Sequence, residues 1–180
     1  MNQKTTLHKL KWFWPWQDDA EEVWLRSMSQ QGWRLVKIGL IGYYTFQAGQ
    51  PADYVYRLDY QTQAKKEAPD YLLLFQDAGW EHVGEMSAWQ YWRKDVQDGK
   101  VPEIFTDNES KVRKYQRLLA FSTISIPLFI FFMIDFTHTR PHAMFPVLEN
   151  ILYAIFFVLF MSFFFSMFMI LRRISELKRK

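Results

Sequence analysis

Alternating aromatic residues at 54–60 form the pattern in this sequence that best suits ligand binding. The run Tyr-Val-Tyr-Arg-Leu-Asp-Tyr predicts a strand that carries its tyrosines on one face and Asp59 on the other. Aromatic faces attract cations, and a nearby carboxylate supplies a counter-charge. We therefore consider a pocket for a small amphipathic ligand, with Asp59 or Glu85 as the acid. The candidate residues are Tyr44, Tyr54, Tyr56, Asp59, Tyr60, Glu85, Tyr91 and Trp92. The simpler interpretation is that these rings fill the core of a small domain.

No pattern in the chain predicts catalysis. The sequence has no Cys, which excludes a thiolate nucleophile, and its four His are scattered, which leaves little basis for a metal site. No glycine-rich phosphate loop and no Ser-His-Asp spacing is visible. We therefore expect a protein that is not an enzyme, with no catalytic residue, no metal and no cofactor.

The formal net charge of +3 averages two unlike halves of the chain. Residues 1–110 hold 12 basic and 16 acidic residues, a net charge of −4, whereas residues 111–180 hold 10 and 3, a net charge of +7. All eight Trp lie in the first half, and 13 of the 17 Phe lie in the second. Because the Trp-rich half is acidic, we do not expect nucleic-acid binding.

Two apolar runs in the second half predict membrane spans. A helix crosses the hydrocarbon core with about 20 apolar residues. We expect a first span at residues 118–136, with Asp135 at the interface, and a second at 147–171. Residues 137–146 would form the loop outside the cytoplasm. Partnership with the lipid bilayer follows directly from this interpretation.

Basic residues at the span ends predict the orientation in the membrane. The loop between the spans carries only Arg140, so the positive-inside rule places both termini in the cytoplasm. We therefore expect a two-pass membrane protein. The residues that indicate this orientation are Lys111, Arg113, Lys114, Arg117, Arg172, Arg173, Lys178, Arg179 and Lys180.

Residue pairs that recur 47 positions apart predict an internal duplication. Trp24, Gly32-Trp33 and Tyr44 recur as Tyr71, Gly79-Trp80 and Tyr91. Each copy has the pattern of a strand, a helix that ends at Gly-Trp, and two further strands. The expected fold is α+β: a duplicated βαββ cytoplasmic domain followed by a two-helix transmembrane hairpin.

The expected domain has bounds that follow from these patterns. The repeats span about residues 4–48 and 53–95 of a cytoplasmic domain at 1–100. Residues 101–117 form a juxtamembrane linker with a helix that starts near Asp107. Residues 172–180 form a basic cytoplasmic tail. Asp18 is expected to cap the first helix, with Glu21 in the capping-box position.

Several of these runs, taken in order, resemble the bacterial domain-of-unknown-function 2812 family over about residues 4–115. The runs that carry the resemblance are Phe13-Trp14-Pro15-Trp16, Gly32-Trp33-Arg34-Leu35, Tyr43-Tyr44-Thr45-Phe46, residues 54–60, Ala78-Gly79-Trp80-Glu81 and Glu103-Ile104-Phe105-Thr106-Asp107. The resemblance implies a protein of the bacterial plasma membrane with an uncharacterised role, and it supplies no catalytic residues. The expected topology is also loosely similar to the gyrase-inhibitor-like effector-binding fold, which implies binding of amphipathic, often cationic, molecules between the repeats.

Two functions from different classes fit these expectations. The first is a membrane protein whose cytoplasmic domain senses a ligand or binds a partner, which could be another protein or a second copy of the chain. The alternative is a small accessory or assembly subunit of a membrane complex, recognised through its Phe-rich helices.

Overall fold

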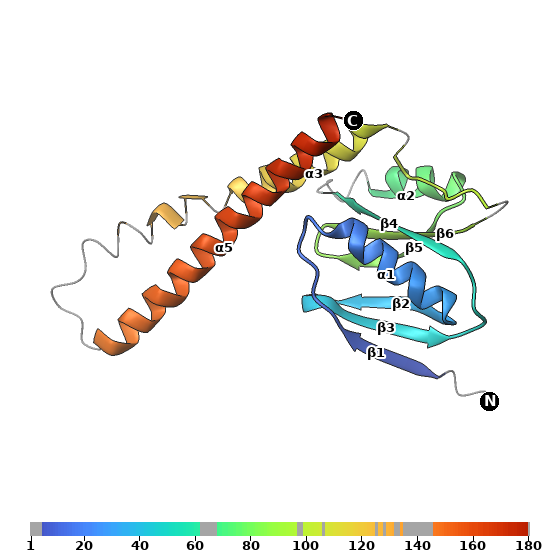
Figure 1. Cartoon of the computed structure of the whole chain (residues 1–180), viewed down its shortest axis with the longest axis horizontal. Coiled ribbons are helices and arrows are strands. Elements are labelled where there is room, and N and C mark those ends of the chain that lie inside the picture. Colours follow the sequence, from blue (N-terminus) through green and yellow to red (C-terminus); the bar gives the residue numbers. More distant parts are fainter. Residues whose placement is uncertain are drawn as a thin grey trace.

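The computed structural model describes residues 5–61, 68–96, 99–105, 107–124, 126–127, 129–131, 134 and 146–179. An α+β domain is followed by two helices that extend away from it (Figure 1). The α+β class is therefore confirmed, whereas the expected hairpin of two transmembrane helices is not shown: one helix of the described residues could cross a membrane. The elements are β1 (Thr6–Leu10), α1 (Asp18–Gln30), β2 (Trp33–Gly39), the short 3₁₀ helix η1 (Leu40–Gly42), β3 (Tyr43–Ala48), β4 (Tyr54–Tyr60), α2 (Ala68–Asp77), β5 (Glu81–Met86), β6 (Trp89–Asp95), α3 (Asn108–Thr123) and α5 (Pro146–Lys178).

The strands form two antiparallel sheets with the same internal order. The first sheet has the order β1-β3-β2 and the second has the order β4-β6-β5. Each sheet also contains a bulge, between Leu35 and Lys37 in β2 and between His82 and Gly84 in β5. These bulges lie 47 positions apart, which is the spacing that the sequence repeat predicts.

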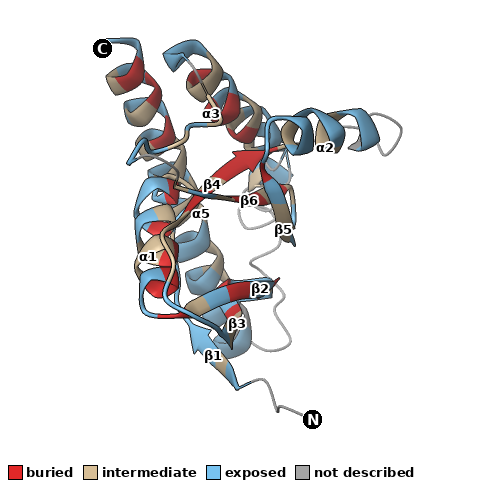
Figure 2. Cartoon of the chain, turned by 90° about the vertical axis from the view of Figure 1, so that its right-hand side faces the viewer, coloured by how far each residue is buried: buried red, intermediate tan, exposed pale blue. Residues whose placement is uncertain are grey.

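The main core lies where α1 meets both sheets. Leu25 and Met28 of α1 pack with Phe46 of the first sheet and with Leu58 and Tyr91 of the second, all of them buried. Figure 2 shows buried segments on α1, β2 and β4. The contacts of α1 include β2 on one side and β4 on the other. One helix of the first repeat therefore supplies core residues to both repeats.

A smaller core lies beneath α2. Val55, Trp80 and Trp92 are buried there, and the rings of Tyr71 and Phe75 pack on Trp92. Both faces of β4 therefore carry buried side chains: Tyr56 and Leu58 belong to the main core and Val55 to the smaller one.

Helix α3 begins as the sequence predicts. Asp107 is the N-cap, and its carboxylate accepts a hydrogen bond from the backbone N–H of Ser110 at 2.6 Å. This cap satisfies one of the backbone donors that the first turn of a helix leaves without a partner. The helix then runs along β4 and pairs with α5.

Helix α5 is long and apolar enough to cross a membrane, and among the described residues it is the one helix that meets this test. Its candidate span, Asn150–Lys178, contains most of the predicted second span. The predicted first span is not established by the structure: α3 covers residues 118–123, and residues 125, 128, 132–133 and 135–136 lie outside the described residues. Residues 137–145 of the predicted loop, and Lys180, also lie outside them.

Candidate functional site

An aromatic cavity of about 330 Å³ opens beside the N-terminus of α1. Its walls come from the segment before α1, from η1, from the inner faces of both sheets and from the turn between β5 and β6. The lining residues are Trp12, Phe13, Trp14, Pro15, Asp18, Glu21, Leu40, Ile41, Gly42, Tyr44, Leu58, Met86, Ser87, Trp89 and Tyr91. The cavity is thus mainly apolar, with two carboxyl groups in its wall.

Glu21 is the buried acid of this cavity, with 5% of its surface exposed. The hydroxyls of Tyr44 and Tyr91 both donate to its Oε1, each at 2.7 Å. Burial raises the pKa of Glu21 above its usual range, the two tyrosine donors oppose that rise, and the charge of Asp18 adds to it. Its ionised form is therefore costly unless a positive charge lies nearby.

The position of Glu21 follows from the face that α1 turns toward the core. Glu21, Leu25 and Met28 follow a spacing of four and three residues, so they share one side of the helix. Leu25 and Met28 are core residues, and the acid occupies the next position of the same stripe. Tyr44 reaches it from the first sheet and Tyr91 from the second, so the carboxyl group joins the two repeats.

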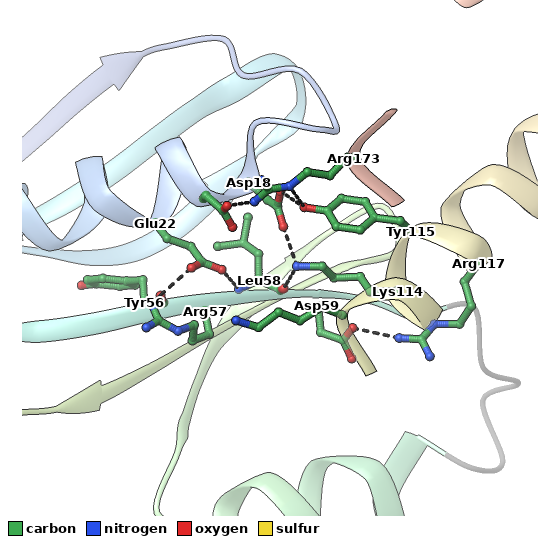
Figure 3. Close-up of polar contacts among 12 residues, drawn as sticks. Asp18, Glu22, Tyr56, Arg57, Leu58, Asp59, Lys114, Tyr115, Arg117 and Arg173 are labelled. Atoms are coloured by element: carbon green, nitrogen blue, oxygen red, sulfur yellow. Dashed lines mark hydrogen bonds and ion pairs between the residues drawn. The ribbon is translucent and has the colours of Figure 1, made fainter. Parts of the chain in front are cut away.

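A buried ion pair lies next to the cavity (Figure 3). The ammonium of Lys114 in α3 donates to Asp18 at 2.5 Å and to the backbone carbonyl of Leu58 at 3.1 Å. The hydroxyl of Tyr115 donates to the other oxygen of Asp18 at 2.6 Å. Burial alone would lower the pKa of Lys114, but Asp18 and Glu22 together hold it above its usual value.

Further ion pairs attach α3 and α5 to the domain. Arg117 donates to Asp59 at 2.9 Å and to the carbonyl of Tyr60 at 2.8 Å. Arg173 of α5 pairs with Asp19 and donates to the hydroxyl of Tyr115 at 3.3 Å. Helices α3 and α5 are therefore held against the domain by ion pairs and hydrogen bonds to α1 and β4.

Glu22 lies on the neighbouring side of α1, in contact with β4. Its carboxylate accepts the backbone N–H of Leu58 at 2.8 Å and pairs with Arg57 at 3.2 Å. Burial raises the pKa of Glu22 to about 7, and the charge of Asp18 adds to this rise, while Lys114 and Arg57 oppose it. This group titrates near neutral pH within the contact between the helix and the second sheet.

Two of the eight predicted ligand residues, Tyr44 and Tyr91, line the cavity. Tyr56 and Tyr60 are buried on the inner face of the second sheet without lining it, and Tyr60 packs edge-on against Trp89. The remaining four lie elsewhere. The hydroxyl of Tyr54 accepts a hydrogen bond from Arg34, and Asp59 pairs with Arg117. Glu85 is exposed and accepts a hydrogen bond from Gln90, while Trp92 packs under α2.

The prediction that Asp18 caps α1 is wrong. Gln17 occupies the N-cap position and makes no side-chain capping bond, and Asp18 instead pairs with Lys114, 96 residues away. Glu21 was equally unexpected as a cavity residue. The sequence feature that could have identified it is its place on the apolar stripe of α1, because a charged side chain that is buried there requires hydrogen-bond or ion-pair partners.

The basic residues that predict orientation have several kinds of partner in the structure. Lys114, Arg117 and Arg173 pair with the folded domain, as described above. Lys111 lies 3.5 Å from Glu103, while Arg113 and Arg172 each pair with a glutamate on their own helix. Arg179 reaches back to Ser175, and Lys178 ends α5.

Comparison with known proteins gives one family. The profile of a family described as "Protein of unknown function (DUF2812)" matches residues 17–126 of this chain. No curated protein and no solved structure matches it.

Proposed function

The chain belongs to the DUF2812 family of proteins of unknown function, and from that premise we propose that it is a membrane-anchored receptor that is not an enzyme. Its α+β domain binds an amphipathic cation in the aromatic cavity. The observation that carries the proposal is the carboxyl group of Glu21, which lies in the wall of an aromatic cavity with two tyrosine hydroxyls as its hydrogen-bond donors.

The lining residues suit such a ligand in both size and charge. A cavity of about 330 Å³ lies at the lower end of the volumes that small-molecule sites have in proteins. Trp12, Trp14 and Trp89 line the cavity, and aromatic side chains attract cations and supply apolar surface for the hydrocarbon part of such a ligand. A bound positive charge would offset the cost of keeping Glu21 ionised in a buried position.

Occupancy of the cavity would be transmitted to the membrane helices through Asp18. This residue lines the cavity and also pairs with Lys114 of α3. A cation near Glu21 lies one helical turn from Asp18, so it competes electrostatically with the ammonium of Lys114 for the same acidic end of α1. In this proposal α5 anchors the protein, both termini are cytoplasmic, and the chain crosses the membrane twice.

The test uses the full chain in lipid nanodiscs, with tetraphenylphosphonium as the probe and triphenylphosphine oxide as its neutral counterpart. All eight Trp lie in residues 1–110, so Trp fluorescence reports the domain. We expect a saturable change with the cation alone, after correction for empty nanodiscs. Glu21→Gln should weaken binding at least about tenfold, equivalent to 1.4 kcal/mol.

Glu85→Gln is the matched control, because Glu85 is an exposed carboxylate of the same domain outside the cavity. It should bind the cation as the unmodified protein does. Equal affinity of the Glu21 and Glu85 variants, or equal binding of the neutral compound, would contradict the proposal.

The accessory-subunit alternative is favoured by the surface of α5. Its apolar side chains are exposed on several sides, among them Phe157, Phe165 and Phe168. A subunit of this kind should keep its partner in detergent when the three phenylalanines are unchanged and lose it when they are replaced by leucine. Retention of the same partner by a chain that ends before α5 would exclude this alternative.

A further inference from the structure

Several of the apolar side chains that line the cavity are exposed and therefore form its rim. Leu40 and Ile41 in η1 are 76% and 72% exposed, and Leu10, Trp12 and Trp14 lie exposed on the adjoining segment. We refer to these five residues as the apolar edge. Large contiguous apolar patches are rare on monomeric soluble domains and mark interaction sites.

The backbone holds this edge together in an unusual conformation. The N–H of Lys11 donates to the carbonyl of Gly42 at 2.9 Å, which fixes η1 against the segment that carries Trp12. Ile41 has a φ of 60°, a conformation that is strained for a β-branched residue. The strain is not offset by burial, because the side chain of Ile41 is largely exposed to solvent.

A series of aromatic contacts connects the edge to the membrane helix. Trp12 packs edge-on against Trp14 with ring centroids 5.8 Å apart, and Trp14 stacks on Trp16 at 5.2 Å. Trp16 in turn packs edge-on against Phe165 of α5 at 5.8 Å. The end of the first sheet that carries the edge also points toward α5 (Figure 1).

The level of this contact along α5 corresponds to the border between hydrocarbon and headgroups. Phe165 precedes the basic pair Arg172-Arg173 by seven residues, which is about 10 Å along a helix. Basic residues of this kind lie at the cytoplasmic surface, and Trp is enriched at the interface just inside it. Lys9 and Lys11, on the same segment, are exposed and suit anionic headgroups.

We propose that the apolar edge inserts into the interfacial region of the cytoplasmic leaflet, so that the domain lies on the membrane surface. Its occupant is lipid, because the edge continues the surface of the apolar helix through Trp16. One consequence rests on the proposed function: the mouth of the cavity then opens toward lipid, where amphipathic cations concentrate. The insertion itself requires no ligand.

The test exploits the absence of cysteine from the sequence. Leu40→Cys and Leu74→Cys are each labelled with a nitroxide in the full chain, reconstituted in nanodiscs that contain anionic lipid. Leu74 is the matched control, since it is a leucine of α2 that is 67% exposed and lies outside the edge. Relaxation of each label by oxygen and by a water-soluble nickel chelate reports its surroundings, without any ligand present.

We expect the ratio of oxygen to nickel accessibility to be several-fold higher at position 40 than at position 74. Equal, water-like values at both positions would overturn the proposal. Protection of position 40 from both reagents would also overturn it, because it would mean that a second copy or another part of the chain covers the edge. Thermal unfolding of each labelled variant verifies that its domain is folded.

Discussion

Replacing Lys114 by methionine should strongly destabilise the domain. Asp18 is only 2% exposed, and it accepts hydrogen bonds from Lys114 and Tyr115. Without the ammonium, a buried carboxylate would keep a single neutral donor. Removing one partner of a buried pair typically costs about 3–5 kcal/mol, because the remaining charge has no compensation. With an m value of about 2 kcal/mol per M, which is typical of small proteins in urea, the midpoint of unfolding should fall by about 2 M.

The assay is urea unfolding of the full chain in nanodiscs, monitored by Trp fluorescence. Lys111→Met is the matched control, since Lys111 lies one turn earlier on α3 and makes a partly exposed contact with Glu103. Exposed pairs contribute about 0–1 kcal/mol, so this midpoint should change little. Adding Asp18→Asn to the Lys114 variant should restore most of the lost stability, because the uncompensated charge is then removed. Equal midpoints for the Lys114 and Lys111 variants would refute the reasoning.

Three further predictions concern pH and backbone conformation. The pKa of Glu22 is raised to about 7 in the fold. Its contribution to the free energy of unfolding is therefore fully present below its ordinary pKa of 4.5 and is lost as pH rises through about 7. Glu22→Gln should therefore remove up to about 3 kcal/mol of pH dependence from unfolding measured at pH 5 and pH 8, and an unchanged slope would contradict this. Affinity for tetraphenylphosphonium should decrease as pH is lowered through the raised pKa of Glu21, whereas the Glu21→Gln variant should show no such decrease in a fluorescence titration. Gly42 and Gly99 both have φ near 70°, but a Cβ at Gly42 would lie 2.1 Å from the carbonyl oxygen of Lys11, while Gly99 faces open space. Gly99→Ala should cost about 1 kcal/mol in urea unfolding and Gly42→Ala clearly more; equal losses would show that the contact with Lys11 is unimportant.

Local patterns in the sequence were sufficient to predict most of the elements. Gly32 and Gly79 follow the helices with φ of 85° and 79°, the conformation that the predicted helix stops require. The partners of buried charges could not be predicted in this way. Glu21 meets tyrosines 23 and 70 residues away, and Asp18 meets Lys114 at a separation of 96 residues. In the first turn of a helix, acids like these have a sufficient local explanation in the helix dipole.

The sequence repeat also conceals a shift in the second copy. Residues 40–42 separate β2 from β3, but only residues 87–88 separate β5 from β6. Ile38 pairs with Tyr44 in the first sheet, whereas Glu85 pairs with Gln90 in the second. Tyr91 therefore lies one position beyond the structural counterpart of Tyr44 and on the opposite face of its strand. Because of this shift it faces α1 and Glu21 instead of α2.

Helix α1 packs against both sheets, so its sequence is more constrained than that of α2 in the second repeat. A substitution on the inner side of α1 has to fit β2 and β4 at once, and near Glu21 it has to fit tyrosines from both sheets as well. Helix α2 packs on the outer face of the second sheet and already exposes Leu73 and Leu74 to solvent. Over evolutionary time, α2 should accumulate replacements faster than α1, so the similarity between the two copies should fade first in their helices.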